Sequence, residues 1–148
     1  MSAKAIDTQH FRKLERMYQS APINEFFRPR LTISRGEAEV VIDVRPDFFH
    51  AAGAAHGALY FKAMDDAAYF AVNSLVTDVF VLTISFTTYL ERPVSQGAIH
   101  CRGKVVMAAK NLFIAESRIV DDQGQEIARG SGHFVKGRTP LTPEIGYH

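Results

Sequence analysis

Two adjacent carboxylates, Asp65 and Asp66, stand in the middle of an otherwise apolar stretch of the chain. Aspartate is a poor residue for a helix interior, and burying its charge is costly unless the charge is paired or hydrogen-bonded. In a helix, Asp66 lies one i,i+4 step from Lys62, so we predict an ion pair between them on the solvent side. Asp65 shares an apolar stripe with Phe61 and is therefore the carboxylate that acid–base or nucleophilic chemistry would use. The alternative for Asp65 is a partly buried carboxylate that is satisfied by hydrogen bonds and has no chemical role.

The two aspartates fall in a helix that we predict over residues 56–74. This helix is rich in alanine, and the segment 126–136 carries small residues at alternate positions, namely Ala128, Gly130 and Gly132. Small residues on both sides allow two backbones to approach closely. We therefore expect a sheet that wraps around this helix.

Alternating apolar and polar residues predict the strands of that sheet. The five predicted strands span residues 37–45, 79–90, 98–107, 112–120 and 126–136. The last four are joined by short connections, which force antiparallel neighbours because parallel strands need a longer crossover. The prediction is an α+β domain in which one long central helix packs against a five-stranded antiparallel sheet.

A short amphipathic helix is predicted over residues 7–18, with Asp7 or Thr8 as its N-cap. A connector that contains Pro22 and Pro29 follows, and we expect little intrinsic structure in it. The length of 148 residues suits a single domain. We divide that domain into an N-terminal helical extension, a core and an extended tail, at residues 1–34, 35–136 and 137–148.

Composition excludes several classes of protein. Hydrophobic residues make up 47% and charged residues 22% of the chain, as in a folded globular protein, and the net charge of +1 argues against nucleic-acid binding. Cys101 is the one cysteine and has no partner for an internal disulfide, and the six histidines lack the spacing of metal ligands. With no secretory signal and no apolar stretch long enough to span a membrane, we expect a cytoplasmic protein without a membrane or metal partner.

The run Gly53-Ala54-Ala55-His56-Gly57-Ala58 precedes Asp65, which lies nine residues after His56. This motif and the order of elements over residues 35–136 resemble the hotdog-fold acyl-CoA thioesterases of the phenylacetate-pathway type, in the 4-hydroxybenzoyl-CoA thioesterase superfamily. The resemblance implies a hotdog fold and the hydrolysis of an acyl-CoA thioester to a free acid and coenzyme A. It implies no cofactor other than the coenzyme A that is part of the substrate.

The resemblance also implies roles for individual residues. Asp65 matches the general base or nucleophile, and Thr83 matches a hydroxyl that helps to hold the attacking water. Gly57 matches the residue whose backbone N–H polarises the thioester carbonyl, and a helix N-terminus has free N–H groups and a positive dipole end to do so. His56 is expected to order the turn before the helix.

The chain departs from the family pattern at three positions. His50 stands where relatives commonly have an Asn or Gln that donates a hydrogen bond near the carbonyl or the water, and a histidine can also donate, although its charge changes near neutral pH. Ala58 replaces the second glycine of the motif, and Asp66 doubles the acid. The alternative for His50 is a turn histidine without a catalytic role.

Substrate contacts are expected from several side chains. Ala58, Phe61 and Met64 are the candidates on the helix, with the N-terminal segment also shaping the acyl pocket. The phosphates of coenzyme A would be held by exposed basic residues, although each is also an ordinary solvated side chain. The candidates for this role are Lys110, Arg129, Lys136 and Arg138.

Members of this family are homodimers, often dimers of dimers, with active sites shared between subunits. For this chain the resemblance therefore implies a site in which the helix N-terminus of one subunit faces Asp65 of another. A non-catalytic module that binds acyl-CoA or a fatty acid is the alternative from a different class. A hotdog dehydratase is less well supported, because the Pro-Gly pair expected after its catalytic histidine is missing from the sequence.

Overall fold

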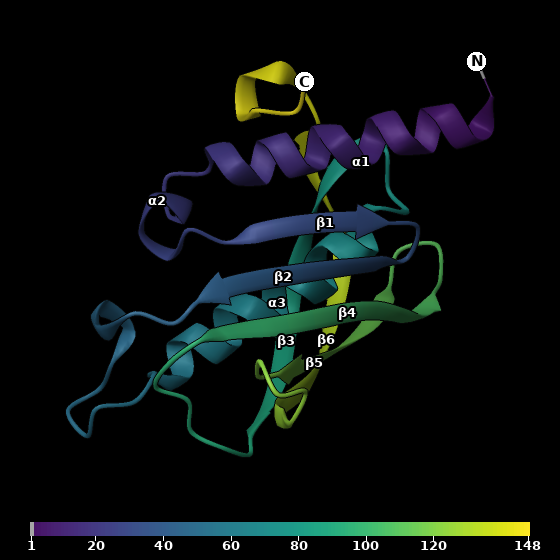
Figure 1. Ribbon diagram of the computed structural model, residues 1–148. Coiled ribbons are helices and arrows are strands. Elements are labelled where there is room, and N and C mark those ends of the chain that lie inside the picture. Colours follow the sequence, from purple (N-terminus) through teal and green to yellow (C-terminus); the bar gives the residue numbers. More distant parts are fainter. Residues whose placement is uncertain (1) are drawn as a thin grey trace.

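A single antiparallel sheet curves around one long helix in the structure, a computed structural model that describes residues 2–148 (Figure 1). The long helix is α3 (Gly57–Asn73), and the six strands stand in the order β1-β2-β4-β5-β6-β3. Their bounds are β1 (Arg30–Ser34), β2 (Glu37–Asp43), β3 (Val79–Leu90), β4 (Ala98–Ala108), β5 (Phe113–Val120) and β6 (Glu126–Pro140). The α+β class, the central helix and the antiparallel sheet are confirmed, whereas the predicted number of five strands is one too low.

The strand missing from the prediction is β1, which pairs with β2. It follows Pro29 and has five residues, so its alternation of polar and apolar side chains, with Leu31 and Ile33 as the apolar ones, is too short to stand out. The predicted connector also contains a one-turn helix, α2 (Asn24–Phe27). The sheet therefore begins inside the segment that we assigned to the N-terminal extension, and β6 continues past residue 136 to Pro140.

Glycine brings the sheet against the helix at one point. A Cβ atom on Gly103 of β4 would lie 2.3 Å from the carbonyl carbon of Ala67, so only glycine lets β4 approach α3 this closely. The predicted close approach of helix and sheet is confirmed, but it depends on a different glycine from those we expected. Gly130 and Gly132 of β6 instead make room for the ring of Phe86.

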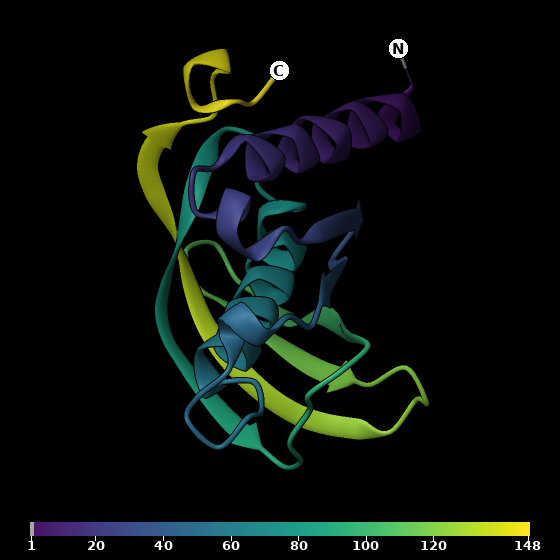
Figure 2. The ribbon, with the colours of Figure 1, turned by 60° about the vertical axis from the view of Figure 1, so that its left-hand side comes forward.

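The first helix, α1 (Ala3–Ser20), lies alongside β1 and across one end of α3 (Figures 1 and 2). It is longer than the predicted 7–18. Its N-cap is Ser2, whose hydroxyl oxygen accepts a hydrogen bond from the N–H of Ala5 at 3.3 Å. Asp7 and Thr8 lie inside the helix, so the predicted N-cap is wrong: Ser2 already serves a free N–H of the first turn.

A buried histidine ties α1 to two other elements. His10 Nε2 lies 2.8 Å from the carbonyl oxygen of Asn73, the last residue of α3, and its Nδ1 lies 2.7 Å from the hydroxyl of Tyr147. Because burial lowers the pKa of His10, the ring is neutral, with its proton on Nε2 to donate to the carbonyl. Tyr147 belongs to the C-terminal segment, which forms the short 3-10 helix η2 (Pro143–Ile145) and lies beside α1 (Figure 2).

Two further features bear on the expectations from composition. Cys101 is fully buried and forms no disulfide, and burial raises the pKa of its thiol, so it is not a reactive cysteine. Within residues 2–148, no helix has the length and apolar character needed to cross a membrane.

Candidate active site

The N-terminus of α3 presents a free backbone donor. His56 is its N-cap, and the ring nitrogen Nδ1 accepts a hydrogen bond from the N–H of Ala58 at 2.9 Å. Gly57 is the first helical residue, and nothing in residues 2–148 accepts a hydrogen bond from its N–H. A side chain at this position would crowd Leu90, whose Cδ1 would lie 2.9 Å from an added Cβ. The first turn of α3 therefore offers an N–H, at the positive end of the helix dipole, to an anionic or carbonyl oxygen.

His50 lies in the turn that leads to this helix and is exposed. Its Nδ1 accepts a hydrogen bond from the backbone N–H of Ala52 at 3.1 Å. In the neutral ring the proton is then on Nε2, which remains available as a donor. His50, His56, Gly57 and Ala58 thus lie together in the segment that begins α3.

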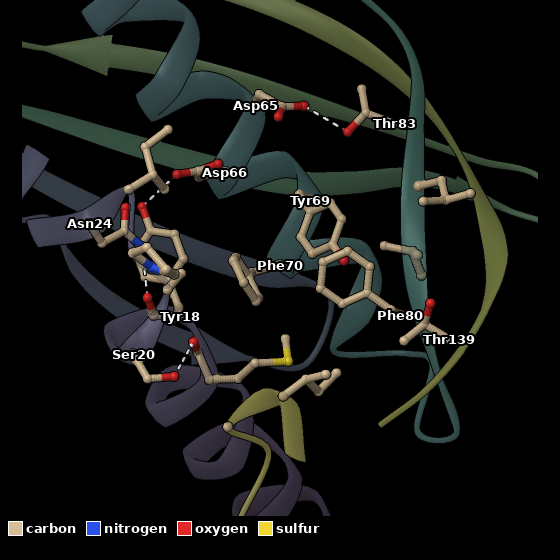
Figure 3. A pocket seen from close by; sticks show the side chains of 18 of the residues that line it. Tyr18, Ser20, Asn24, Asp65, Asp66, Tyr69, Phe70, Phe80, Thr83 and Thr139 are labelled. Carbon is tan, nitrogen blue, oxygen red and sulfur yellow. Dashed lines mark hydrogen bonds between the residues drawn. The ribbon is translucent and has the colours of Figure 1, made fainter. Parts of the chain in front are cut away.

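Asp65 lies two turns further along α3 and contacts β3. The hydroxyl of Thr83 donates a hydrogen bond to Oδ1 of Asp65 at 2.9 Å, which leaves Oδ2 free for another donor (Figure 3). Burial raises the pKa of Asp65 to about 6, and the negative charge of Asp66 adds to this effect, while Thr83 and Lys62 oppose it. A carboxylate that titrates near neutral pH is suited to act as a general base.

Asp66 makes the predicted ion pair but does not face solvent. Its Oδ2 lies 2.6 Å from Lys62 Nζ and accepts a hydrogen bond from the hydroxyl of Tyr18 at 2.5 Å. Its side chain is only 15% exposed, and that of Lys62 only 11%. The predicted solvent-facing position is therefore wrong, because α1 carries Tyr18 over this face of α3 and covers both charges.

A cavity of about 920 Å³ opens beside the two aspartates. Asp65 and Thr83 line one side of it, and the rings of Tyr69, Phe70 and Phe80 line much of the remainder (Figure 3). Further walls come from the last turn of α1, the connector after it, and the C-terminal segment. Apolar side chains of these segments and of β3 also line the cavity, among them Met17, Val81, Leu82 and Ile145. The arrangement therefore sets a carboxylate base against a mainly apolar space, whose lining also includes the charged residues Lys62, Asp66 and Glu144.

One chain does not bring Asp65 and Gly57 together. They are eight residues apart on one helix, which corresponds to about 12 Å along its axis. A single thioester group cannot contact both at that distance. The structure thus divides the predicted catalytic residues into two groups, Asp65 with Thr83 and Gly57 with its neighbours.

Sequence comparison decides the family. Residues 52–128, more than half of the chain, match the family model of the thioesterase superfamily. The chain belongs to the thioesterase superfamily. The matched range contains His56, Gly57, Asp65 and Thr83. A comparison with curated protein sequences gives no match.

Solved structures share the fold of this thioesterase-superfamily chain. The PaaI protein of E. coli, from the phenylacetic acid degradation operon, is similar with a TM-score of 0.83 and 18% identity over 92% of this chain and 99% of that one. A conserved protein from Pseudomonas aeruginosa gives a TM-score of 0.77 with 22% identity, over 82% of this chain and 98% of that one. A mutant of the phenylacetic acid degradation protein PaaI from Thermus thermophilus gives 0.72 with 23% identity, over 79% and 100%. These similarities establish the predicted hotdog fold.

The other predicted contact residues of this superfamily member are scattered. Phe61 is 45% exposed on α3 and packs edge-to-face on Phe86, with ring centroids 5.9 Å apart. Met64 is fully buried in the core and does not line the cavity. Lys110 lies exposed in the turn between β4 and β5, and Arg129 is paired with Glu126 at 2.9 Å, so neither lines the cavity.

The sequence prediction did not include Tyr18, the aromatic wall or the C-terminal wall of the cavity. Tyr18 is the last residue of the predicted amphipathic helix, and its place there predicts burial but not a contact with Asp66. Phe80 stands in a strand pattern that gives no sign of a cavity beside it. The C-terminal segment has no periodic pattern at all, so nothing in its sequence predicts that Ile145 lines the same space as Asp65.

Proposed function

We propose that the protein hydrolyses acyl-CoA thioesters, with Asp65 as general base or nucleophile and the Gly57 N–H as donor to the thioester oxygen. The observation that carries the proposal is the Asp65–Thr83 pair at the edge of a large apolar cavity, in a chain of the thioesterase superfamily. A pKa of about 6 makes Asp65 largely ionised at neutral pH and still basic enough to accept a proton from water.

In the general-base route, a water molecule donates to Oδ2 of Asp65 and attacks the thioester carbonyl carbon while its proton moves to the carboxylate. The carbonyl oxygen becomes an oxyanion, held by the Gly57 N–H, and a donor of this kind contributes about 2.7–4 kcal/mol in other enzymes. The C–S bond then breaks, and the coenzyme A thiolate takes the proton back from Asp65. In the nucleophilic route, Asp65 itself attacks the carbonyl carbon, and the C–S bond breaks to release the coenzyme A thiolate and leave a mixed anhydride. Water then hydrolyses the anhydride, which regenerates the Asp65 carboxylate and frees the acid, and the proton from that water goes to the thiolate. Thr83 holds the carboxylate in place in both routes.

His50 donates a hydrogen bond to the same thioester oxygen or to the attacking water. Its Nε2–H is the donor left free by the bond from Ala52, and it lies in the segment that leads to Gly57. We propose that this N–H does the work that an amide side chain does in relatives of the phenylacetate-pathway type.

The proposed site contains two copies of the chain. Because Asp65 and Gly57 of one chain are too far apart, the Gly57 that serves Asp65 belongs to a partner subunit. Edge strand β3 supports such a pairing: it bonds to β6 on one side only and exposes apolar side chains on its surface, which unpaired edges of monomers avoid. Those side chains are Leu82, Ile84, Tyr89 and Leu90, between 50% and 61% exposed.

The contacts of β3 suggest how the two copies pair. Thr83 is bonded to Asp65, and Leu90 lies against Gly57. If two β3 strands pair antiparallel with Thr83 opposite Leu90 of the partner subunit, directly opposite side chains lie about 5 Å apart. That register brings each Asp65 next to the Gly57 of the other subunit. We propose a homodimer of this kind, which can assemble further into a dimer of dimers.

The cavity indicates a bulky apolar acyl group. Its volume of about 920 Å³ lies near the upper end of the roughly 300–1,000 Å³ found for pockets that enclose whole small ligands. An acetyl group would leave most of it empty. For the phosphates of coenzyme A we retain the exposed Lys110 and Arg129 as candidate contacts.

The experiment is a thiol-release assay of the purified protein on a panel of aryl and fatty acyl-CoAs. We expect turnover of bulky acyl-CoAs by the unchanged protein and a loss of at least about a hundredfold in Asp65→Asn. Asp47→Asn, which changes an exposed acid outside the site, is the matched control. Full activity of Asp65→Asn contradicts the assignment, and binding of acyl-CoA without turnover supports the non-catalytic binding module instead.

A further inference from the structure

The proposed mechanism assigns no role to Asp66, although Asp66 and Lys62 form a largely buried ion pair. Asp66, Lys62 and Tyr18 form a buried polar cluster in which both contacts to Asp66 are 2.6 Å or shorter. Apolar residues in place of such a buried cluster are often equally or more stabilising. The hydrogen bond from the Tyr18 hydroxyl to the ion pair is directional, and it therefore fixes the position of α1 relative to α3.

The cluster also contains the aromatic surroundings of the lysine. Lys62 Nζ lies 5.0 Å from the ring centroid of Tyr18 and 5.5 Å from that of Phe27, and Tyr18 packs edge-to-face on Phe70 at 5.0 Å. The last turn of α1 and the following α2 therefore converge on one charged pair of α3. Removal of the Tyr18 hydroxyl alone would leave these ring contacts in place.

The end of α1 that Tyr18 holds is also a wall of the cavity. Met17 and Tyr18 line it together with the connector from Ser20 to Asn24. The C-terminal wall packs closely against the same turn of α1. The backbone of Gly146 is so near Ser20 that an added Cβ would lie 2.4 Å from the Ser20 hydroxyl oxygen. In its middle α1 is held separately, by the hydrogen bond from His10 to the carbonyl of Asn73.

Asp66, the neighbour of Asp65 in the sequence, is thus joined through Tyr18 to the wall of the cavity, which Asp66 and Lys62 also line. We infer that Asp66 is a positioning residue, which through Tyr18 fixes the end of α1 as the wall of the acyl cavity and so sets which acyl groups reach Asp65. This inference rests on the proposed function, in which the acyl group of the thioester occupies that cavity. It assigns selectivity for bulky acyl groups to a contact between α1 and α3 that touches neither the thioester nor the coenzyme A.

The test uses Tyr18→Phe, which removes one hydroxyl and keeps the ring. Affinities for two non-hydrolysable thioether analogues of acyl-CoA, one with a phenylacetyl-sized group and one with a two-carbon group, are measured by calorimetry. We expect the Kd of the bulky analogue to rise at least about tenfold, because the wall that it packs against loses the bond that fixes its position, and that of the short analogue to change less than about twofold. Equal changes for both analogues, or none, would overturn the inference, as would absence of binding of the bulky analogue to the unchanged protein.

Two further variants make the result specific. Tyr60→Phe removes the hydroxyl of a second buried tyrosine, which lies in α3 and donates to the carbonyl of Arg92 at 2.7 Å, and should leave both affinities unchanged. Ile145→Ala shortens the C-terminal wall from a partly exposed position and should shift selectivity towards bulkier groups, even if Tyr18→Phe folds poorly. Hydrolysis is scored separately on the unchanged protein: binding without turnover refutes the hydrolase proposal, whereas the Kd pattern decides the role of Asp66.

Discussion

The hydroxyl of Thr83 donates a 2.9 Å hydrogen bond to Oδ1 of Asp65, and so joins the edge strand β3 to the middle of α3. This bond fixes one carboxylate oxygen and leaves the other free on the cavity side. It also links the residue proposed to do the chemistry to the strand proposed to pair with a second subunit.

The pH dependence of hydrolysis reports the ionisation of Asp65. The base is active when deprotonated, and burial holds its pKa at about 6. We therefore expect kcat/KM to be level above about pH 7 and to fall about tenfold per pH unit below 6. A kcat/KM that stays level down to about pH 4, where an ordinary aspartate titrates, and falls only below it would contradict the raised pKa.

Thr83→Val removes the hydroxyl and keeps the shape of the side chain. Because the hydrogen bond from Thr83 stabilises the charged form of Asp65, its loss should raise the pKa and move the acid limb of the profile to higher pH. We also expect kcat to fall about 10- to 100-fold, since the carboxylate loses its support. Thr77→Val, at an exposed position before the same strand, is the matched control and should retain the parent profile. Indistinguishable pH profiles for the two variants would show that Thr83 does not support the Asp65 carboxylate in catalysis.

Asp65→Asn should make the folded protein more stable near neutral pH. The pKa of Asp65 is higher in the folded state than in the unfolded chain, so the aspartate favours folding less as it ionises. The free energy of unfolding that is lost through the ionisation of Asp65 is zero below about pH 4, grows between about pH 4 and 6, and reaches about 1–3 kcal/mol above pH 6. Urea unfolding at pH 4 and pH 8 measures this: the gain from Asp65→Asn should be present at pH 8 and absent at pH 4. Destabilisation at pH 8 would show that the carboxylate supports the fold.

The central helix and most of the sheet could be predicted because each has a strong local period. Asp65 could be singled out for the same reason, since a charge on an apolar stripe stands out without knowledge of the fold. β1 could not, because its alternation covers only five residues and directly follows the proline-containing connector. The bond from Tyr18 to Asp66 joins residues 48 positions apart, and the helical pattern alone placed Asp66 on a polar face. Whether a helix face meets solvent depends on which distant segment covers it, and here that segment is α1.

Ile84→Lys tests the edge of β3 as the subunit interface. Ile84 is 60% exposed and lies at an irregularity in the pairing of β3 with β6. A lysine there should block pairing between two β3 strands by charge repulsion and desolvation, and convert the protein to a monomer. Light scattering after size-exclusion chromatography gives the mass, and we expect activity to be lost together with the dimer. A fully active monomer would refute the shared site, and Val106→Lys on β4 is the control for a new surface charge at an exposed apolar residue.

The most direct test of the central claim mixes two inactive variants. Asp65→Asn removes the base, and Gly57→Pro removes the backbone N–H at the first helical position, where the helical backbone accepts proline. The added ring displaces only the exposed end of the Leu90 side chain, which is free to change rotamer. Each variant alone should have little activity. If Asp65 of one subunit works with Gly57 of the other, a mixed dimer contains one intact site, and unfolding and refolding the two variants together in equal amounts should restore about a quarter of the parent activity. Activity that stays at the level of the separate variants, although mixed dimers have formed, would contradict the shared active site.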